Sequence, residues 1–219
     1  NKLFKLAARQ NLKRGFLFVS TVLGKHIPVS PIVSLLMGRI LATEVMKFKD
    51  NKKIENNTLY HLLNDYFENS ANEVNTEINS KLNEEYQKIL KEKFTLKEKT
   101  LFIGFAETAT ALGHSVFENF KDNSFFLHTT REYLKDVNKL SEFCEEHSHA
   151  TEHFLYGNPQ KFDRIVLIDD EFTTGNTALN FILELKKNLG VKEYTLLSIL
   201  DWRNEESIEK LKNFEIENK

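Results

Sequence analysis

The chain reads Arg164-Ile-Val-Leu-Ile-Asp-Asp-Glu-Phe-Thr-Thr-Gly-Asn-Thr177 in the stretch that decides its fold, and the helical run Ala178 to Lys187 follows. Four consecutive apolar residues before paired carboxylates predict a buried parallel strand, and the Thr/Gly-rich turn predicts the N-terminus of a helix. In open α/β sheets, ligands bind at the carboxyl ends of the strands, which is where this turn must lie.

The same stretch carries groups suited to a sugar phosphate. Asp169 and Asp170 can accept hydrogen bonds from a vicinal diol such as that of a ribose. The loop backbone and its Thr hydroxyls can surround a phosphate at the positive end of the helix dipole. The predicted phosphate loop consists of Thr173, Thr174, Gly175, Asn176 and Thr177. The alternative is an ordinary strand-to-helix turn in which Asp and Thr only cap the helix.

Length and charge exclude some classes of protein. The 219 residues fit one domain with an elaboration. A net charge of −2 argues against electrostatic capture of nucleic acid. Residues 1–53 hold eleven basic and two acidic side chains, so this segment carries +9 and the remainder −11. The basic segment is either a solvated face or a means of attracting a polyanionic substrate.

Cysteine content and hydropathy predict a cytoplasmic protein that does not enter membranes. Cys144 is the only cysteine, so no intramolecular disulfide can form. The most apolar window, residues 31–46, is interrupted by Gly38, Arg39 and Glu44 and is not expected to span a bilayer. No secretory signal is visible. Because the chain begins at Asn1, we expect a processed or shortened form of a longer polypeptide.

Hydrophobic periodicity predicts an α/β fold with a central, mainly parallel sheet flanked by helices. Ser30 and Pro31 are suited to start a helix that continues to about Phe48. Residues 131–160 lack clear apolar periodicity and are predicted to form a long polar loop that acts as a lid. The predicted core strands are Thr100–Phe105, Phe125–Thr130, Ile165–Asp169 and Tyr194–Leu200, with a helix over 108–120.

We expect a single domain over residues 1–219. Within it we distinguish an N-terminal hood segment (1–49), a helical insertion (50–99), a catalytic core (100–203) and a tail (204–219). The insertion is expected to hold two amphipathic helices, because apolar residues recur at helical spacing from Leu59 to Phe67 and from Val74 to Leu90.

The run from Ile168 to Thr177 resembles the phosphoribosyl-pyrophosphate (PRPP) loop of type I phosphoribosyltransferases. In that family the two acids hold the ribose hydroxyls and the Thr/Gly loop holds the 5-phosphate. Glu171 departs from the family pattern, which usually has an apolar residue there. A third carboxylate either adds affinity for Mg²⁺ or marks a subfamily with altered chemistry.

Several further blocks are similar to one subfamily, the orotate-phosphoribosyltransferase-like group of bacterial tellurium-resistance and stress-response gene clusters. In that subfamily a small C-terminal domain often follows, and we expect it to be absent here or removed. The blocks are Lys25–Pro28, Gly104–Glu118, Leu127–Arg131, Glu145–Tyr156, Ile168–Thr177 and Leu197–Asn204.

The resemblance implies a second ligand loop after the strand Thr100–Phe105. In type I phosphoribosyltransferases the corresponding loop binds pyrophosphate through backbone amides, which here assigns Ala106, Glu107 and Thr108. Glu107 would need Mg²⁺ between itself and pyrophosphate; otherwise Glu107 and Thr108 only cap the next helix. Arg131 closes the next strand and can pair bidentately with pyrophosphate oxygens, unless it is an exposed surface residue.

Two groups of basic residues complete the predicted site. In the sugar-phosphate context, His147 and His149 can act from a mobile hood on the leaving group or the nucleophile. With His153 they also have a spacing that can chelate Zn²⁺ on a helix, and a third option is that all three are ordinary loop histidines. The resemblance adds Lys25 and His26 as contributors to a hood over the nucleophile.

These assignments predict a Mg²⁺-dependent glycosyltransferase that joins PRPP to a nitrogenous base or base-like nucleophile, with Asp169, Asp170 and Arg131 as catalytic residues. Asp169 and Asp170 are also the expected Mg²⁺ ligands. The alternative is a PRPP-sensing module without catalysis. Nucleic acid and membrane are not expected as partners. Type I relatives commonly pair as dimers, so a homodimer is one option.

Overall fold

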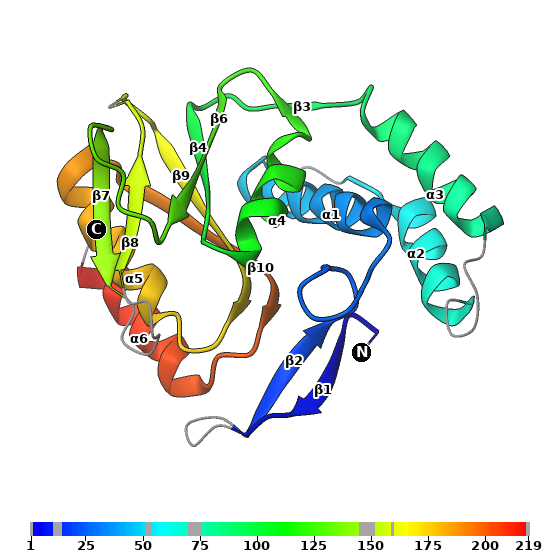
Figure 1. Ribbon diagram of the computed structural model, residues 1–219. Helices are drawn as coiled ribbons and strands as arrows, with labels where there is room; N and C mark the ends of the chain where they lie inside the picture. The colour runs from blue at the N-terminus through cyan, green and yellow to red at the C-terminus, as the bar shows by residue number, and fades with distance from the viewer. Residues whose placement is uncertain are drawn as a thin grey trace. The chain divides into compact units, whose positions relative to one another are not determined.

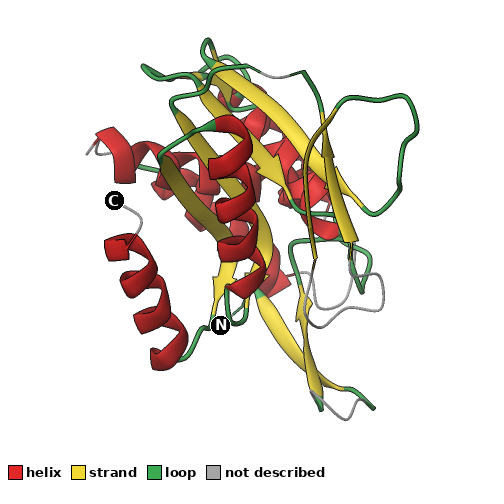
Figure 2. Ribbon diagram, turned by 90° about the vertical axis from the view of Figure 1, so that its left-hand side faces the viewer, coloured by secondary structure: helices red, strands yellow, loops and turns green. Residues whose placement is uncertain are grey.

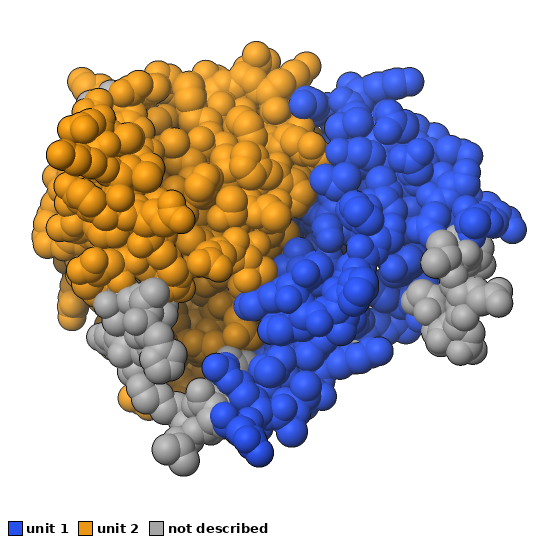
Figure 3. All heavy atoms as spheres, viewed as in Figure 1, with its two compact units in different colours: residues 1–93 blue, residues 94–219 orange. Residues whose placement is uncertain are grey.

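A computed structural model gives the structure of the chain and describes residues 2–10, 15–50, 54–69, 76–144, 152–158 and 160–217. The chain divides into two compact units, residues 1–93 and 94–219, which Figure 3 distinguishes by colour. The boundary between the two units lies after Lys93. That residues 1–219 form a single domain stays a prediction.

Unit 1 opens with an antiparallel hairpin that the sequence analysis missed. Its strands are β1 (Phe4–Ala8) and β2 (Phe16–Ser20), paired so that Phe4 lies opposite Ser20. Aromatic residues on both sides of the basic sequence segment 9–14 were the available signal. The hairpin is tied into unit 1 by an ion pair of 2.6 Å between Lys2 Nζ and Glu68 Oε1.

Three helices form the rest of unit 1. Burial of Leu36, Leu59 and Leu82 gives them a shared apolar core, and α3 packs against both α1 and α2. The helix predicted from Pro31 and the two helices predicted within the insertion are confirmed. They are α1 (Pro31–Asp50), α2 (Asn57–Asn69) and α3 (Thr76–Ile89), as Figure 1 shows.

The centre of unit 2 is a six-stranded sheet with the strand order β10-β9-β4-β6-β8-β7. β10, β9, β4 and β6 run parallel to one another, whereas β8 pairs antiparallel with both β6 and β7. The predicted α/β fold with a mainly parallel sheet is confirmed. The strands are β4 (Thr100–Gly104), β6 (Ser124–Thr130), β7 (Lys139–Cys144), β8 (Glu152–Tyr156), β9 (Arg164–Phe172) and β10 (Glu193–Asp201).

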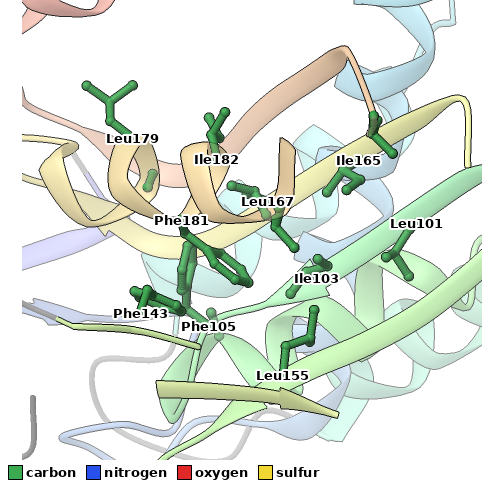
Figure 4. Close-up of a cluster of buried hydrophobic side chains, with 14 of the residues drawn as sticks. Leu101, Ile103, Phe105, Phe143, Leu155, Ile165, Leu167, Leu179, Phe181 and Ile182 are labelled. Carbon is green, nitrogen blue, oxygen red and sulfur yellow. The ribbon is translucent and has the colours of Figure 1, made fainter. Parts of the chain in front are cut away.

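Helices cover both faces of this sheet, as Figure 2 shows. Because side chains alternate along a strand, Leu101 and Ile103 of β4 face a core shared with Phe181 of helix α5 (Asn176–Leu189), drawn in Figure 4. Phe102, on the opposite face, meets Phe117 of helix α4 (Thr108–Phe117) with the ring centroids 6.3 Å apart. A short parallel pair, β3 (Phe94–Thr95) with β5 (Phe120–Lys121), completes this side.

The prediction of a long polar loop over residues 131–160 is wrong for half of its described part, because β7 and β8 lie within it. Ser141 and Phe143 point inward while Glu142 and Cys144 are exposed, which is the two-residue alternation of a half-buried strand. Phe154 and Leu155 are buried in β8. Short strands rich in polar residues give a weak periodic signal, and Glu145 to Thr151 lie outside the described residues.

The predicted tail (204–219) contains a helix, α6 (Glu205–Glu217). The Asn204 side chain accepts the N–H of Ser207 at 2.9 Å and so caps the first turn, and Glu205 and Glu206 carry negative charge there. Leu211 and Phe214 of α6 pack against the core that α5 also covers. Within the described ranges, none of the helices has the length and apolar character needed to cross a membrane.

Substitution of Phe181, whose ring is stacked in the core, tests how α5 packs in unit 2. Phe181 is fully buried and lies 4.2 Å from the ring of Phe143, measured between centroids. Phe181→Ala should lower the free energy of unfolding by about 3–5 kcal/mol, because it leaves a cavity. Leu183→Ala, at a 38% exposed position of the same helix, is the control and should cost much less. Equal losses in urea denaturation would contradict this packing.

Candidate functional site

The paired acids lie inside β9 rather than after it. The sequence predicts that the strand ends at Asp169, but β9 continues to Phe172 because Glu171 and Phe172 still pair with Leu200 and Asp201 of β10. Asp169 Oδ1 accepts the backbone N–H of Asp170 at 2.9 Å. Asp170 is buried and Asp169 half-buried, so two carboxylates are held on ordered backbone at the carboxyl end of the strand.

The predicted phosphate loop joins β9 to α5. Thr173 and Thr174 are exposed, and Thr174 Oγ1 accepts the N–H of Asn176 at 3.3 Å. Gly175 is the N-cap of α5 and has φ 78°, a left-handed conformation that favours glycine. Glycine has no side chain with which to cap the helix. The first-turn amides are therefore suited to an anion.

Residues that the sequence analysis did not assign support this loop from the C-terminal segment. The Arg203 guanidinium donates to both carboxylate oxygens of Asp201, at 2.8 and 2.6 Å. A Cβ on Gly175 would lie 3.4 Å from Arg203 Cδ, so the arginine stem backs the loop. Lys210 Nζ of α6 donates to Asn176 Oδ1 at 2.7 Å. For Arg203 the available signals were its place in the block Leu197–Asn204 and its position directly after the last predicted strand.

The hydrogen-bonded pair of Asp201 and Arg203 shifts the pKa values of both side chains. The hydrogen bond from Arg203 holds the pKa of the Asp201 carboxyl below its usual value. The same bond raises the pKa of Arg203. The pair therefore places a permanently charged guanidinium, already oriented, beside the phosphate loop.

The second predicted ligand loop starts at the same edge of the sheet. In the parallel ladders Gly104 pairs with both His128 of β6 and Ile168 of β9, so the residues that follow each of these strands emerge together. The N–H of Phe105 donates to the carbonyl of Ile168 at 3.0 Å. A Cβ on Gly104 would lie 2.5 Å from the backbone oxygen of Ala109, so only glycine allows α4 to start this close to β4.

Within this loop the three predicted pyrophosphate-binding residues differ in surroundings. The Ala106 N–H donates to Thr129 Oγ1 at 2.8 Å. The Ala106–Glu107 peptide bond is cis. Glu107 is exposed at the N-cap of α4 and makes no capping hydrogen bond with its side chain. Thr108, half-buried, is the first residue of α4. Their role in binding pyrophosphate stays a prediction.

The structure brings some of the other predicted residues to this edge and not others. Arg131 directly follows β6 and is half-buried, so it belongs to the same edge as Gly104 and Asp169. Lys25 and His26 are exposed in a turn of unit 1, before α1. The remaining predicted hood residues, His147 and His149, lie outside the described residues.

His153 does not lie in the surface loop where the sequence analysis placed it. It belongs to β8, is fully buried, and stacks on Phe143 with a centroid distance of 4.7 Å. In the described part of the chain, no three His, Cys, Asp or Glu side chains cluster in a way that could hold a metal ion. A zinc site that includes His153 would have to draw on a side chain already packed in the core.

The pH dependence of stability should reveal the Asp201–Arg203 pair. Because the pKa of Asp201 is lowered in the folded state, the pair stabilises the fold above the unfolded pKa of about 3.9 and loses this effect as the pH falls below it. Asp201→Asn should lower the free energy of unfolding at pH 7 by up to about 1 kcal/mol, since the pair is partly solvated. The difference from the wild type should shrink below pH ~4; a difference that does not change with pH would contradict the assignment.

Comparison with known proteins finds similar solved structures and one matching family model. No curated protein matches it in sequence. The solved structures that match include adenine phosphoribosyltransferase from Rhodothermus marinus, with a TM-score of 0.39 and 16% identity over 53% of this chain and 64% of that chain. Adenine phosphoribosyltransferase from Trypanosoma brucei, in complex with AMP, pyrophosphate and ribose-5-phosphate, also matches. Its TM-score is 0.39, with 19% identity over 64% of this chain and 58% of that chain.

Hypoxanthine phosphoribosyltransferase from Staphylococcus aureus gives a TM-score of 0.36 and 11% identity over 54% of this chain and 61% of that chain. The chain thus matches less than two thirds of the length of each of these three proteins. The model of a family described as phosphoribosyl transferase, by contrast, matches residues 3–219, nearly the whole chain. The chain belongs to the phosphoribosyl transferase family of enzymes.

Proposed function

We propose that this protein is a Mg²⁺-dependent phosphoribosyltransferase that transfers the ribose 5-phosphate of PRPP to a nitrogenous base or base-like nucleophile and releases pyrophosphate. The observation that carries the proposal is the register of β4 with β9. That register brings the acidic pair Asp169 and Asp170 to the edge of the sheet where the loop of Ala106 to Thr108 starts. Family membership supports the same reaction.

The ribose 5-phosphate half of PRPP is assigned to β9 and its loop. Asp169 and Asp170 accept hydrogen bonds from the ribose hydroxyls, and the loop Thr173–Thr177 receives the 5-phosphate at the start of α5. Arg203 lies behind Gly175 and is already paired with Asp201. It therefore contributes positive potential to the loop without being free to move onto the phosphate.

The donor set fits Mg²⁺ as an ion shared with the substrate. Carboxylate oxygens such as those of Asp169 and Asp170 suit this cation, which is usually held by one or two carboxylates plus substrate phosphates rather than by a protein cage. When bound, Mg²⁺ would neutralise charge on the departing pyrophosphate.

The protein groups then act on bond cleavage at C1 of the ribose. As the C1–O bond to pyrophosphate breaks, the ribose acquires oxocarbenium character and the nucleophile approaches from the opposite face. Arg131 and the amides near Glu107 and Thr108 stabilise the departing charge. We assign Lys25, His26, His147 and His149 to a hood that limits hydrolysis by excluding water.

Three finer assignments belong to the same proposal. On its sequence blocks, we assign the chain to the orotate-phosphoribosyltransferase-like subfamily of tellurium-resistance and stress-response gene clusters. We propose that it acts in the cytoplasm, where its single cysteine, Cys144, stays reduced. A homodimer is the proposed assembly. Light scattering of the purified protein measures the assembly directly.

Calorimetric titration with PRPP, with and without Mg²⁺, tests the proposal when followed by a pyrophosphate-release assay against a panel of bases. Mg²⁺-dependent binding with release on one base establishes the transferase and the class of its nucleophile. Binding without release on any base favours a PRPP-sensing module. A protein that does not bind PRPP contradicts the proposal.

Neutralising the acidic pair should remove activity and preserve the fold. Asp169→Asn/Asp170→Asn should lower kcat/KM for PRPP by about 100-fold or more, because both groups orient the ribose. The control is Glu205→Gln/Glu206→Gln, which removes two adjacent exposed carboxylates at the start of α6. Normal turnover by the Asp169/Asp170 double variant, with far-UV circular dichroism unchanged, would refute the assignment.

Substitutions of the two glycines at the ends of α5 distinguish the effect of backbone strain from the effect on ligand binding. Gly175 and Gly190 have φ values of 78° and 67°, so alanine at either should lower the free energy of unfolding by about 1–2 kcal/mol. Only Gly175→Ala should also weaken PRPP binding, by about 10-fold, because Gly190 lies at the far end of the helix. Denaturation and titration of both variants measure the two effects. Similar PRPP affinities would exclude the phosphate from this loop.

A further inference from the structure

A buried hydroxyl fixes the backbone of the loop that contains Ala106. Thr129, near the end of β6, is fully buried, and its Oγ1 accepts the Ala106 N–H at 2.8 Å. This contact holds the backbone directly before the Ala106–Glu107 peptide bond. The direction in which Glu107 and Thr108 leave the sheet therefore depends on the position of one threonine oxygen.

A histidine lies behind that hydroxyl. His153 Nδ1 is 3.2 Å from Thr129 Oγ1, and the His153 side chain is also fully buried. Thr129 Oγ1 has one hydrogen of its own. The Thr129 hydroxyl can accept from Ala106 and still form a second hydrogen bond with Nδ1, because it has one hydrogen and two lone pairs. Which of the two atoms donates depends on the imidazole tautomer.

Aromatic packing fixes the imidazole. The ring lies on Phe143 at 4.7 Å and 22°, and Phe143 in turn lies on Phe181 of α5 at 4.2 Å and 29°. Phe105, the residue before Ala106, contacts Phe143 and Phe181 edge-on or tilted at 5.9 and 5.7 Å. Figure 4 shows Phe105, Phe143 and Phe181 gathered between the sheet and α5. The ring of His153 thus has little freedom to turn away from Thr129.

We propose that His153 is a positioning residue that acts through Thr129 to hold the Ala106–Thr108 loop in the geometry that receives pyrophosphate. A buried polar side chain costs free energy unless it is hydrogen-bonded, and an apolar residue would fill the same place on Phe143. What the imidazole adds is a hydrogen-bond partner that fixes the position of the Thr129 hydroxyl. The inference rests on the proposed function, since it assigns pyrophosphate to this loop.

Paired substitutions separate the hydrogen-bonding group from the ring. His153→Phe keeps an aromatic ring on Phe143 and removes the hydrogen-bonding group, whereas His153→Asn removes the ring and keeps an amide, which can donate or accept, close to the position of Nδ1. Thr129→Val similarly preserves shape without the hydroxyl, and Thr129→Ser preserves the hydroxyl. The probes are pyrophosphate with Mg²⁺, for the Ala106–Thr108 loop, and ribose 5-phosphate, for the Thr173–Thr177 loop, each titrated by calorimetry against the full chain.

The expected result is a selective loss of pyrophosphate affinity. His153→Phe and Thr129→Val should weaken pyrophosphate binding about 3- to 10-fold and leave ribose 5-phosphate binding unchanged. His153→Asn and Thr129→Ser should bind pyrophosphate more tightly than these two, even where thermal unfolding shows that His153→Asn is the less stable histidine variant. This order separates positioning from packing, because a packing role alone makes His153→Asn the worst binder.

Two outcomes would overturn the inference. If the wild type binds both ligands and all four variants match it, or lose both ligands in proportion to their loss of stability, His153 only packs the core and the proposed function stands. If the wild type binds neither ligand, the proposed function fails and the positioning role fails with it.

Discussion

The parallel pairing of β4 with β9 is the constraint on which the rest of unit 2 depends. It sets Gly104 opposite Ile168, and the Phe105 N–H continues the ladder one residue further by donating to the Ile168 carbonyl. Both strands are buried through their paired residues. A shift of one residue would turn Leu101 and Ile103 toward α4 and Phe102 toward α5, so that neither set of side chains would meet its packing partners. The positions of Asp169 and of the loop after Gly104 follow directly from this register.

Backbone approach is the second requirement at this edge. Gly104 admits the first turn of α4 because a Cβ would collide with Ala109, and Gly175 starts α5 in a left-handed conformation. Both glycines bring the N-terminus of a helix close to the end of a strand, where amide groups favour anions. The two helices α4 and α5 lie on opposite faces of the sheet, so one edge can present two anion sites of the same physical kind.

The sequence sufficed for the parts of the fold where periodicity and turn chemistry agree. β4 and β9 have continuous apolar runs, β10 is mostly apolar, and α5 begins after a Thr/Gly turn, so their order and type were predictable. β7 and β8 were not, because Ser141 and His153 occupy inward positions where an apolar residue would have marked the strand. Their burial is explained by partners from other elements: Asn188 of α5 donates to Ser141, and Thr129 of β6 contacts His153.

The candidate site shows the same division. Asp169, Gly175 and Arg131 could be placed at the carboxyl edge from the sequence, since strand order alone puts them there. Arg203 and Lys210 could not, because no motif assigned a role to Arg203 at the end of the predicted core, and Lys210 lies in the predicted polar tail. Their proximity to Gly175 and Asn176 arises only when β10 pairs beside β9 and α6 folds back on the core.

The hydrogen bond from Lys210 of α6 to Asn176 connects this helix to the loop Thr173–Thr177. Binding and local unfolding are thermodynamically linked, so whatever orders the start of α5 also opposes the opening of α6. In amide hydrogen exchange, a ligand bound to the loop would slow the exchange of Thr173 to Thr177 and also that of Glu205 to Glu217. Helix α6 would thus report, at a distance, whether the proposed sugar-phosphate site is filled.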